Sequence, residues 1–396
     1  AARDANNWQA RLMVIFMILF LVGSVWSAIY YAPYMLGYGP NIFPTSHARD
    51  IMGLFNVTLF FTGIVFVLTQ IALFWFAYKY REQTGRKALY ISHDNKLEII
   101  WTIIPAVVMS ILVVLGLDVW NNTMADVDYE TEMPMGLHTG EEGQYLEIEA
   151  TGQQFGWVLR HPGRDGLIGT KNWKMIDGTN EVGQDFTDSK NIDDLIIPSS
   201  GALVLPVNTK IRARITSKDV LHNFDIPHFM VKMDAIPGIP TYFVFEPEMT
   251  TKEYRKHLSQ FPEWNTPFDS EEPDGLKRWE AFNFELACAE LCGKAHYSMR
   301  RVVEVVSVEE YNDWLRDTEA TSSTYLNEIR NTDKDPFIDQ RNLRIEQDIK
   351  DWAIEKEKRK QDKLDAIKEK QPKVEAPVVT PESNEEEVDS VSNDSI

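Results

Sequence analysis

The residues best suited to chemistry are gathered in one short stretch, CAELCGKAHYSM, which runs from Cys288 to Met299. Both cysteines of the 396-residue chain lie in it, together with His296 and Met299. Thiolate, imidazole and thioether groups are soft ligands that favour copper over calcium, magnesium or manganese. Zinc is served less well, because structural zinc sites use four cysteine or histidine ligands. The stretch therefore predicts a copper site.

The same spacing is also compatible with a helix or with a disulfide. Positions 288, 292, 296 and 299 would share one face of a helix, and two cysteines in an exported domain would form a disulfide. Gly293 and the strand-like residues on both sides argue against the helix. A disulfide would leave the nearby His296 and Met299 without a role.

A further ligand is expected from an earlier part of the chain, since metal sites in β-sandwiches commonly combine a loop cluster with a residue near another strand end. His222 fits, because it follows the predicted strand TKIRARITS within SKDVLHNF. A single histidine is more often structural than a ligand. The remaining histidines are expected to be structural or surface residues: His47, His93, His138, His161, His228 and His257.

The elements that must position this cluster are strands. Between about Tyr145 and Val306, seven segments alternate between apolar and polar residues: YLEIEA, FGWVLR, ALVLPV, TKIRARITS, TYFVFEP, FNFELA and RVVEVVSV. Short strands of this kind are typical of a small all-β sandwich or barrel. An insertion at about 248–280 interrupts them, with TKEYRKHL predicted as a short amphipathic helix and PEWNTPFDSEEPDG as a loop.

The N-terminal third contains three stretches without Lys, Arg, Asp or Glu. Residues 51–78 cover 28 positions and residues 99–117 cover 19, and about 20 apolar residues cross the hydrocarbon core of a bilayer. Residues 12–31 are too long and too aromatic for a signal peptide, although a signal peptide or an uncleaved anchor is the alternative. We therefore expect three membrane-spanning helices.

The loops predict the orientation. Basic residues favour the cytoplasmic side, and they are concentrated in the second loop, KYREQTGRKALYISHDNK, whereas APYMLGYGPNIFPTSHARD is nearly uncharged. We expect a cytoplasmic N-terminus, with everything after Leu117 outside. The N-terminal span, the outer metal domain and the long acidic tail suit a bacterial cytoplasmic membrane, with the β-domain in the periplasm, more than a mitochondrial protein.

Charge limits the possible partners. Asp and Glu number 60 against 40 Lys and Arg, so the formal charge of −20 argues against a nucleic-acid partner and is compatible with a basic protein partner.

The C-terminal segment is predicted to be helical and then disordered. EEYNDWLRD is predicted to close the β-domain as a helix, and RIEQDIKDWAIEKEKRKQDKLDAIKEK gives a charged helix with a thin apolar stripe. From Gln371 the chain has seven acidic residues against Lys373 and is expected to be disordered. This tail is either a solvated linker or a docking segment.

Three motifs in sequence order resemble subunit II of the haem-copper cytochrome c oxidases: DVLHNF around His222, KMDAIPG from Lys232 to Gly238, and CAELCGKAHYSM. The resemblance covers roughly residues 51–306. It implies a membrane α-helical part followed by an all-β, Greek-key, cupredoxin-like domain that holds the dinuclear copper centre CuA.

The expected organisation has five parts. Residues 1–50 form an extra N-terminal transmembrane helix and an outer loop, and residues 51–122 form a transmembrane helical hairpin. Residues 123–316 form the periplasmic CuA domain, which includes the insertion at about 248–280. Residues 317–370 form a charged helical extension, and residues 371–396 form a disordered acidic tail.

The resemblance also implies a complete ligand set. Cys288 and Cys292 each bridge two copper ions. His222 and Met299 complete one copper, and His296 with the main-chain carbonyl of Glu290 completes the other. Two bridging thiolates share the charge, so such a centre relays single electrons with little rearrangement. The Glu290 side chain is assigned to Mg²⁺ at the boundary with subunit I, because a hard carboxylate suits a hard cation.

Glu98 carries a separate expectation. It lies in KLEIIWT at the cytoplasmic start of the last span, where the family has a glutamate at the mouth of one proton channel into subunit I. The alternative is a merely solvated carboxylate at the membrane edge.

One departure concerns the place where electrons arrive. The family has W-x-W near its first outer strand, and the first tryptophan accepts electrons from cytochrome c. Here Phe155 stands at that position and Trp157 at the second. Asp219 matches an acidic position that steers basic cytochrome c, but its neighbour is Lys218. This implies a donor held in a complex, and the lack of Cys-x-x-Cys-His implies that the chain carries no c-type haem of its own.

The function implied by the resemblance is that of the electron-accepting subunit of an aa3-type, proton-translocating cytochrome c oxidase. Cytochrome c or a tethered c-type haem domain supplies electrons, which pass through CuA to haem a of subunit I, where haem a3 and CuB reduce oxygen to water. Other oxidase subunits, membrane lipid and a quinol-oxidising assembly called alternative complex III are expected partners. Three alternatives stay open: a copper-free quinol-oxidase subunit, a structural scaffold with a disulfide loop, and a CuA domain serving nitrous oxide or nitric oxide reduction.

Overall fold

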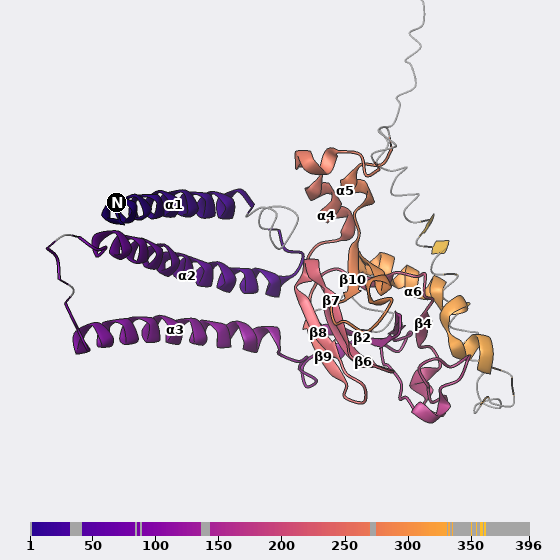
Figure 1. The fold of residues 1–396 in the computed structure, drawn as a ribbon. Coiled ribbons are helices and arrows are strands. Elements are labelled where there is room, and N and C mark those ends of the chain that lie inside the picture. The colour runs from indigo at the N-terminus through magenta and orange to yellow at the C-terminus, as the bar shows by residue number, and fades with distance from the viewer. Residues whose placement is uncertain are drawn as a thin grey trace, which may run out of the picture. The chain divides into compact units, whose positions relative to one another are not determined.

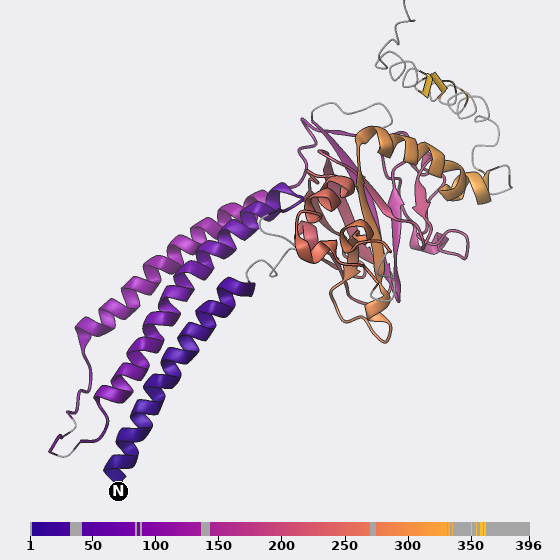
Figure 2. The same cartoon turned by 90° about the horizontal axis from the view of Figure 1, so that it is seen from above.

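The computed structural model describes residues 2–31, 42–83, 85–87, 89–135, 143–269 and 275–330, with isolated positions up to residue 361. In the N-terminal part, three long helices lie side by side (Figures 1 and 2): α1 (Ala2–Tyr31), α2 (Ser46–Lys79) and α3 (Asn95–Thr123). All three are long and apolar enough to cross a bilayer. The three predicted spans are confirmed.

The start of α3 follows from a local signal. The Asp94 side chain accepts hydrogen bonds from the main-chain amides of Lys96 and Leu97, at 3.0 and 3.2 Å, and so caps the helix. Glu98 is exposed in this first turn, where the helix dipole favours a negative charge. It therefore lies at the end of the span.

Two β-sheets follow the helices. Their strand orders are β4-β3-β2-β6-β9, with β1 paired to β2, and β5-β11-β10-β7-β8. The pairs β1–β2, β2–β6 and β5–β11 are parallel, and the other pairs are antiparallel. The strands are β1 (Met133–Pro134), β2 (Gln144–Gln153), β3 (Gly156–His161), β4 (Leu195–Ile197), β5 (Leu203–Pro206), β6 (Lys210–Ser217), β7 (His222–Ile226), β8 (Val231–Ala235), β9 (Thr241–Phe245), β10 (Phe284–Cys288) and β11 (Arg300–Val306).

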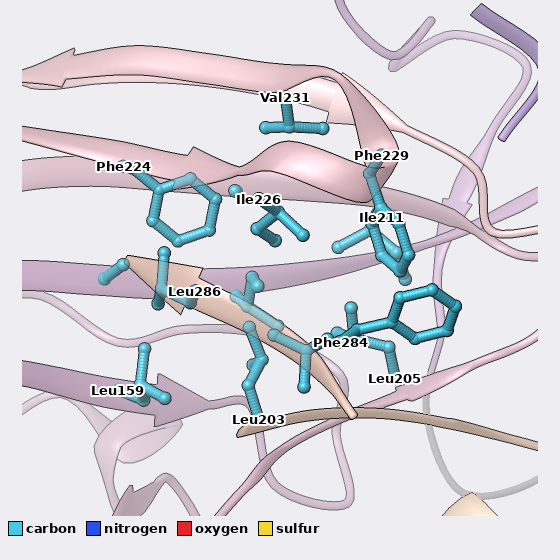
Figure 3. Packing of buried hydrophobic residues seen from close by; sticks show 14 of the residues in the cluster. Leu159, Leu203, Leu205, Ile211, Phe224, Ile226, Phe229, Val231, Phe284 and Leu286 are labelled. Carbon is cyan, nitrogen blue, oxygen red and sulfur yellow. The ribbon is translucent and has the colours of Figure 1, made fainter. Parts of the chain in front are cut away.

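Apolar side chains from alternate strand positions fill the space between the sheets (Figure 3). In β6 the buried residues Ile211, Ala213 and Ile215 alternate with partly exposed ones. Phe224 of β7 and Leu286 of β10 are buried in the other sheet. Burying one such side chain contributes about 1.5–3 kcal/mol to stability. Each of the seven predicted strands overlaps an observed one, and the all-β prediction is confirmed.

Four short strands escape the sequence pattern. β1 and β4 have only two and three residues, and β7 is buried at four of its five positions, so buried and exposed residues do not alternate along it. β8, with five residues, was also not predicted. β7 matters most, because His222 is its first residue and does not lie in a loop after β6. β7 pairs with β10 in a register that sets Phe224 opposite Cys288. The pairing brings His222 and Cys288 to the same end of one sheet.

The insertion packs against the sandwich. Helix α4 (Thr251–Leu258) forms where predicted, and a capping box between Thr250 and Glu253 stabilises its N-terminus. Leu258 is buried in the core, and so is Trp264, which lies in the segment predicted as a loop. The many turn-forming residues of that segment predict a loop, but its apolar residue Trp264 packs into the core.

Helix α6 (Val308–Ser322) closes the domain as predicted, and a capping box between Ser307 and Glu310 stabilises its N-terminus. Most of the predicted extension beyond residue 330 and the whole tail 371–396 lie outside the described residues. The remaining short helices are η2 (Trp173–Met175), η3 (Ser189–Asn191), η4 (Pro227–Phe229), η5 (Pro262–Asn265), α5 (Arg278–Ala281), η6 (His296–Ser298) and η7 (Tyr325–Ile329).

Candidate metal centre

The loop between β10 and β11 carries most of the predicted ligands. β10 ends at Cys288, η6 begins at His296, and Met299 directly precedes β11. No helix runs through positions 288–299, all of which the structure describes, so the helical alternative is wrong. Cys288, Cys292 and Met299 are only 9%, 5% and 1% exposed. Three sulfur-bearing side chains thus point inward from one loop.

Four further donor atoms converge on the two cysteine sulfurs. Cys288 Sγ lies 3.8 Å from His222 Nδ1 and 3.1 Å from the carbonyl oxygen of Glu290. Cys292 Sγ lies 3.5 Å from His296 Nδ1 and 3.3 Å from Met299 Sδ. The ligating atoms of His222 and both cysteines all lie within 4.8 Å of one another. The two cysteines are not joined by a disulfide.

Asp219 fixes the orientation of His222. Its Oδ1 lies 2.9 Å from His222 Nε2, which leaves Nδ1 facing Cys288. Its carboxylate also accepts hydrogen bonds from the amides of Gln154 and Val220, each at 2.7 Å. Burial alone would raise the pKa of Asp219, but these hydrogen bonds outweigh it and lower the pKa. The sequence did not lead us to this orienting role, although the spacing Asp219-x-x-His222 offered a signal.

The other side of the His222 ring is bounded by β2 and β3. A Cβ atom at Gly152 would lie 2.8 Å from His222 Cδ2, so only glycine leaves room for the ring. Trp157 packs edge-on against the same ring, with centroids 6.1 Å apart. Trp157 is 3% exposed. It is therefore part of the wall behind His222 and not a surface residue.

Phe155 covers the cysteine loop from outside. Gly293 has φ +134°, and a Cβ atom there would lie 3.2 Å from the Phe155 ring. The neighbouring Gln154 side chain donates a 2.5 Å hydrogen bond to the Cys292 carbonyl oxygen. Phe155 is 38% exposed. It is a partly exposed aromatic residue that lies against the cysteine loop.

The electrostatics suit a site where a cysteine thiol loses its proton when a cation binds. Burial, followed by the neighbouring Cys288, raises the pKa of Cys292 to about 11. The thiol is therefore protonated at neutral pH, and a thiolate ligand forms there only when a bound cation offsets the cost of the negative charge.

The remaining candidates lie apart from this group. Glu98 is in the first turn of α3. Among the described residues, His222, Cys288 and Cys292 form one group that could hold a metal ion, and His296 adjoins this group through Cys292. His161 lies in the core beside Tyr311, and His228 packs among aromatic rings, whereas His138 lies outside the described residues.

The donor set fits copper. Two thiols, two imidazoles and a thioether are soft donors, and they meet at one largely buried place where little rearrangement is needed to share an ion. The fold and site together define a membrane-anchored, cupredoxin-like protein with a group of side chains that could hold a metal ion.

Comparison with known families agrees. The family model "Cytochrome C oxidase subunit II, transmembrane domain" matches residues 42–119, and "Cytochrome C oxidase subunit II, periplasmic domain" matches residues 146–251. The first match covers α2 and α3, and α1 precedes it. Together with a relative that is 30% identical and is matched over 77% of its length, these matches show that the chain belongs to the cytochrome c oxidase subunit II family.

Individual relatives have low sequence identity to this chain, but the matches extend over long segments. An "Alternative cytochrome c oxidase subunit 2" from Bradyrhizobium diazoefficiens is 30% identical over 260 residues, covering 66% of this chain and 77% of the relative. Cytochrome c oxidase subunit 2 of Cereibacter sphaeroides is 25% identical over 300 residues, covering 73% of this chain and 81% of the relative. The solved periplasmic domain of subunit II of cytochrome oxidase from Bradyrhizobium japonicum is 26% identical, with a TM-score of 0.26, and the match covers 44% of this chain and 92% of that domain.

Proposed function

We propose that this chain is the electron-accepting subunit of an aa3-type cytochrome c oxidase. It receives electrons from cytochrome c at a dinuclear copper site and passes them to haem a of subunit I, which reduces oxygen to water and pumps protons. The observation that carries the proposal is the convergence of five soft side chains on one buried place: His222, Cys288, Cys292, His296 and Met299.

Each donor has a place in this proposal. Cys288, Cys292, His222, His296, Met299 and the Glu290 carbonyl would together hold the copper pair. Bound there, the copper pair supplies a one-electron redox centre. The chain supplies rigidity, since Asp219 holds the His222 ring and Gln154 holds the Cys292 carbonyl. Burial of the sulfur atoms keeps bulk water away from them.

Phe155 is the proposed arrival point for electrons. Its ring is partly exposed and lies against the cysteine loop, while the buried Trp157 packs against His222. Phe155→Leu should slow oxidation of cytochrome c several-fold without changing the copper content. Phe268→Leu is a matched control, because Phe268 is an exposed phenylalanine in the insertion. Equal rates for the two variants would remove Phe155 from the path.

The surface next to the site supports docking of other oxidase subunits. Leu221, Leu291 and Tyr297 are each adjacent in sequence to a proposed ligand, and they are 50%, 79% and 80% exposed. Exposed apolar residues gathered near one place are typical of an interface. We propose subunit I as the occupant, with the net charge of −20 steering a basic cytochrome c nearby.

The donor is proposed to be held in place, as a tethered c-type haem domain or through alternative complex III. Phe155 in place of a tryptophan and the additional helix α1 support this arrangement. The isolated oxidase should then show reduced activity with soluble cytochrome c. Full activity with the soluble donor would contradict it.

Glu290 is proposed to serve two metals. Its carbonyl oxygen faces Cys288, and its side chain is exposed for Mg²⁺ shared with subunit I. Glu290→Gln in the assembled oxidase should lower the magnesium content and leave copper in place. Unchanged magnesium would contradict this assignment.

The proposed location is the bacterial cytoplasmic membrane, with the N-terminus in the cytoplasm and the β-domain in the periplasm. The basic residues between α2 and α3 support this orientation. Protease should reach residues after Trp120 only from the periplasmic side, and cleavage from the cytoplasmic side would overturn the topology.

Copper stoichiometry tests the proposal. The full chain in detergent, loaded with copper under reducing conditions, should retain two coppers per chain after dialysis. Cys292→Ser and His222→Gln should each retain less than one, whereas His93→Gln, an exposed histidine, should retain two. Equal copper in all four proteins would refute the site.

A further inference from the structure

A polar cavity lies beside the candidate metal centre, and none of the proposed copper ligands lines it. It measures about 260 Å³. Its wall includes Trp157, Glu181, Ser199, Ser298, Arg300 and Arg301. This volume is far above the ~10–15 Å³ that a single water molecule needs. The cavity can therefore hold a small ligand.

Arg301 is the unusual residue of this wall. It occupies a buried position of β11, where exposed and buried residues alternate, and it is 6% exposed. One guanidinium nitrogen, Nη2, lies 3.3 Å from the carbonyl oxygen of Ile197. Nε and Nη1 are buried and have no hydrogen-bond partner among the described residues. A buried guanidinium without an acceptor is destabilising, so these two donors favour an anion as the ligand of the cavity.

The other groups of the wall point to the same kind of ligand. Trp157 Nε1 is a buried N–H donor that also has no partner within the described part of the chain. Glu181, the acidic residue of the wall, accepts a 2.6 Å hydrogen bond from the Gln153 amide. Arg300 already contacts Glu285 at 3.1 Å. The wall groups named above as having no hydrogen-bond partner among the described residues, on Arg301 and Trp157, are all donors. They suit a ligand whose oxygens accept hydrogen bonds.

We propose that this cavity binds a small oxyanion, either inorganic phosphate or a small organic carboxylate, through Arg301 with the Trp157 indole as a second donor. Charge-assisted hydrogen bonds from a guanidinium to such an anion are short and strong. The site does not rest on the copper proposal, because none of its donors is a proposed copper ligand.

Binding can be measured on the metal-free full chain in detergent. Sodium phosphate and sodium succinate are titrated separately at constant ionic strength, with sodium chloride as the balancing salt. At least one should bind saturably and raise the midpoint of thermal unfolding. Arg301→Met should weaken binding at least ~tenfold. Arg278→Met removes an exposed arginine that lies outside the cavity wall and should change it less than twofold.

A second comparison separates a binding role from a structural one. Without anion, Arg301→Met should unfold at the same temperature as the native chain or higher, because the substitution removes an uncompensated buried charge. Arg301→Lys should keep part of the binding. The proposal is overturned if neither anion binds saturably, or if Arg301→Met lowers the unfolding temperature while both proteins respond equally to the anion. Binding of only phosphate or only succinate supports the site and identifies its ligand.

Discussion

Gly152 and His222 lie so close that a side chain at position 152 would collide with the imidazole: a Cβ atom there would be 2.8 Å from His222 Cδ2. This contact joins the end of β2 to the first residue of β7. The position of the imidazole is therefore set by packing from one sheet and by Asp219 from the loop before β7.

Gly152→Ala should displace the ring from Cys288 and lower copper affinity by at least ~tenfold. Gly156→Ala is the matched control, because nothing lies within 4 Å of an added Cβ atom there. Competition with a copper chelator measures both variants against the native chain. Equal affinities for the two variants would contradict the packing argument.

Asp219 should matter through the acceptor atom it offers to His222. Asp219→Ala removes that acceptor and should lower copper affinity by about 10–100-fold, whereas Asp219→Asn keeps a side-chain oxygen and should recover part of it. If Asp219 acts only by attracting cytochrome c, both variants will keep native copper affinity and differ from the native chain in association rate.

His161 predicts a pH dependence of stability. Burial lowers the pKa of His161 to about 3, against 6.5 in the unfolded chain. Between these values only the unfolded state binds the proton, so stability is full above pH 6.5 and falls by about 1.4 kcal/mol for each pH unit of acidification. Replacing His161 by Gln should remove about 2 kcal/mol of the loss between pH 7 and pH 5 in denaturant unfolding. An unchanged slope would show that His161 is protonated in the folded state.

Glu98 is exposed at the start of α3. If Glu98 forms the mouth of a proton channel, as the family resemblance implies, it should influence turnover without influencing the metal. Glu98→Gln in the assembled oxidase should slow oxygen reduction and leave the copper content unchanged. Glu82→Gln, in the same loop region, is a suitable control and should leave turnover at the native rate. Native turnover of Glu98→Gln would remove the proton-channel role.

Much of this architecture could be predicted because its signals are local. Runs without charge predict α1, α2 and α3, and strict alternation predicts long strands such as β6. The loop from Cys288 to Met299 could be identified because unusual residue types are concentrated in it. Local signals also predict α4 and α6, whose capping boxes lie in the sequence.

The features that could not be predicted depend on contacts between distant residues. β7 has five residues and gains its strand pairing from β8 and β10. The need for glycine at position 152 arises only when His222 packs against it. The buried donors of Arg301 are invisible in a sequence that reads as an ordinary alternating strand.

The central claim is that one buried site in this chain holds a pair of copper ions that share a single electron. Electron paramagnetic resonance on the copper-loaded, mildly oxidised full chain tests it most directly. The account predicts two coppers and one unpaired electron per chain, with hyperfine splitting from two equivalent copper nuclei. A signal from a single isolated copper, or a copper-free chain in which Cys288 is joined to Cys292, would contradict it.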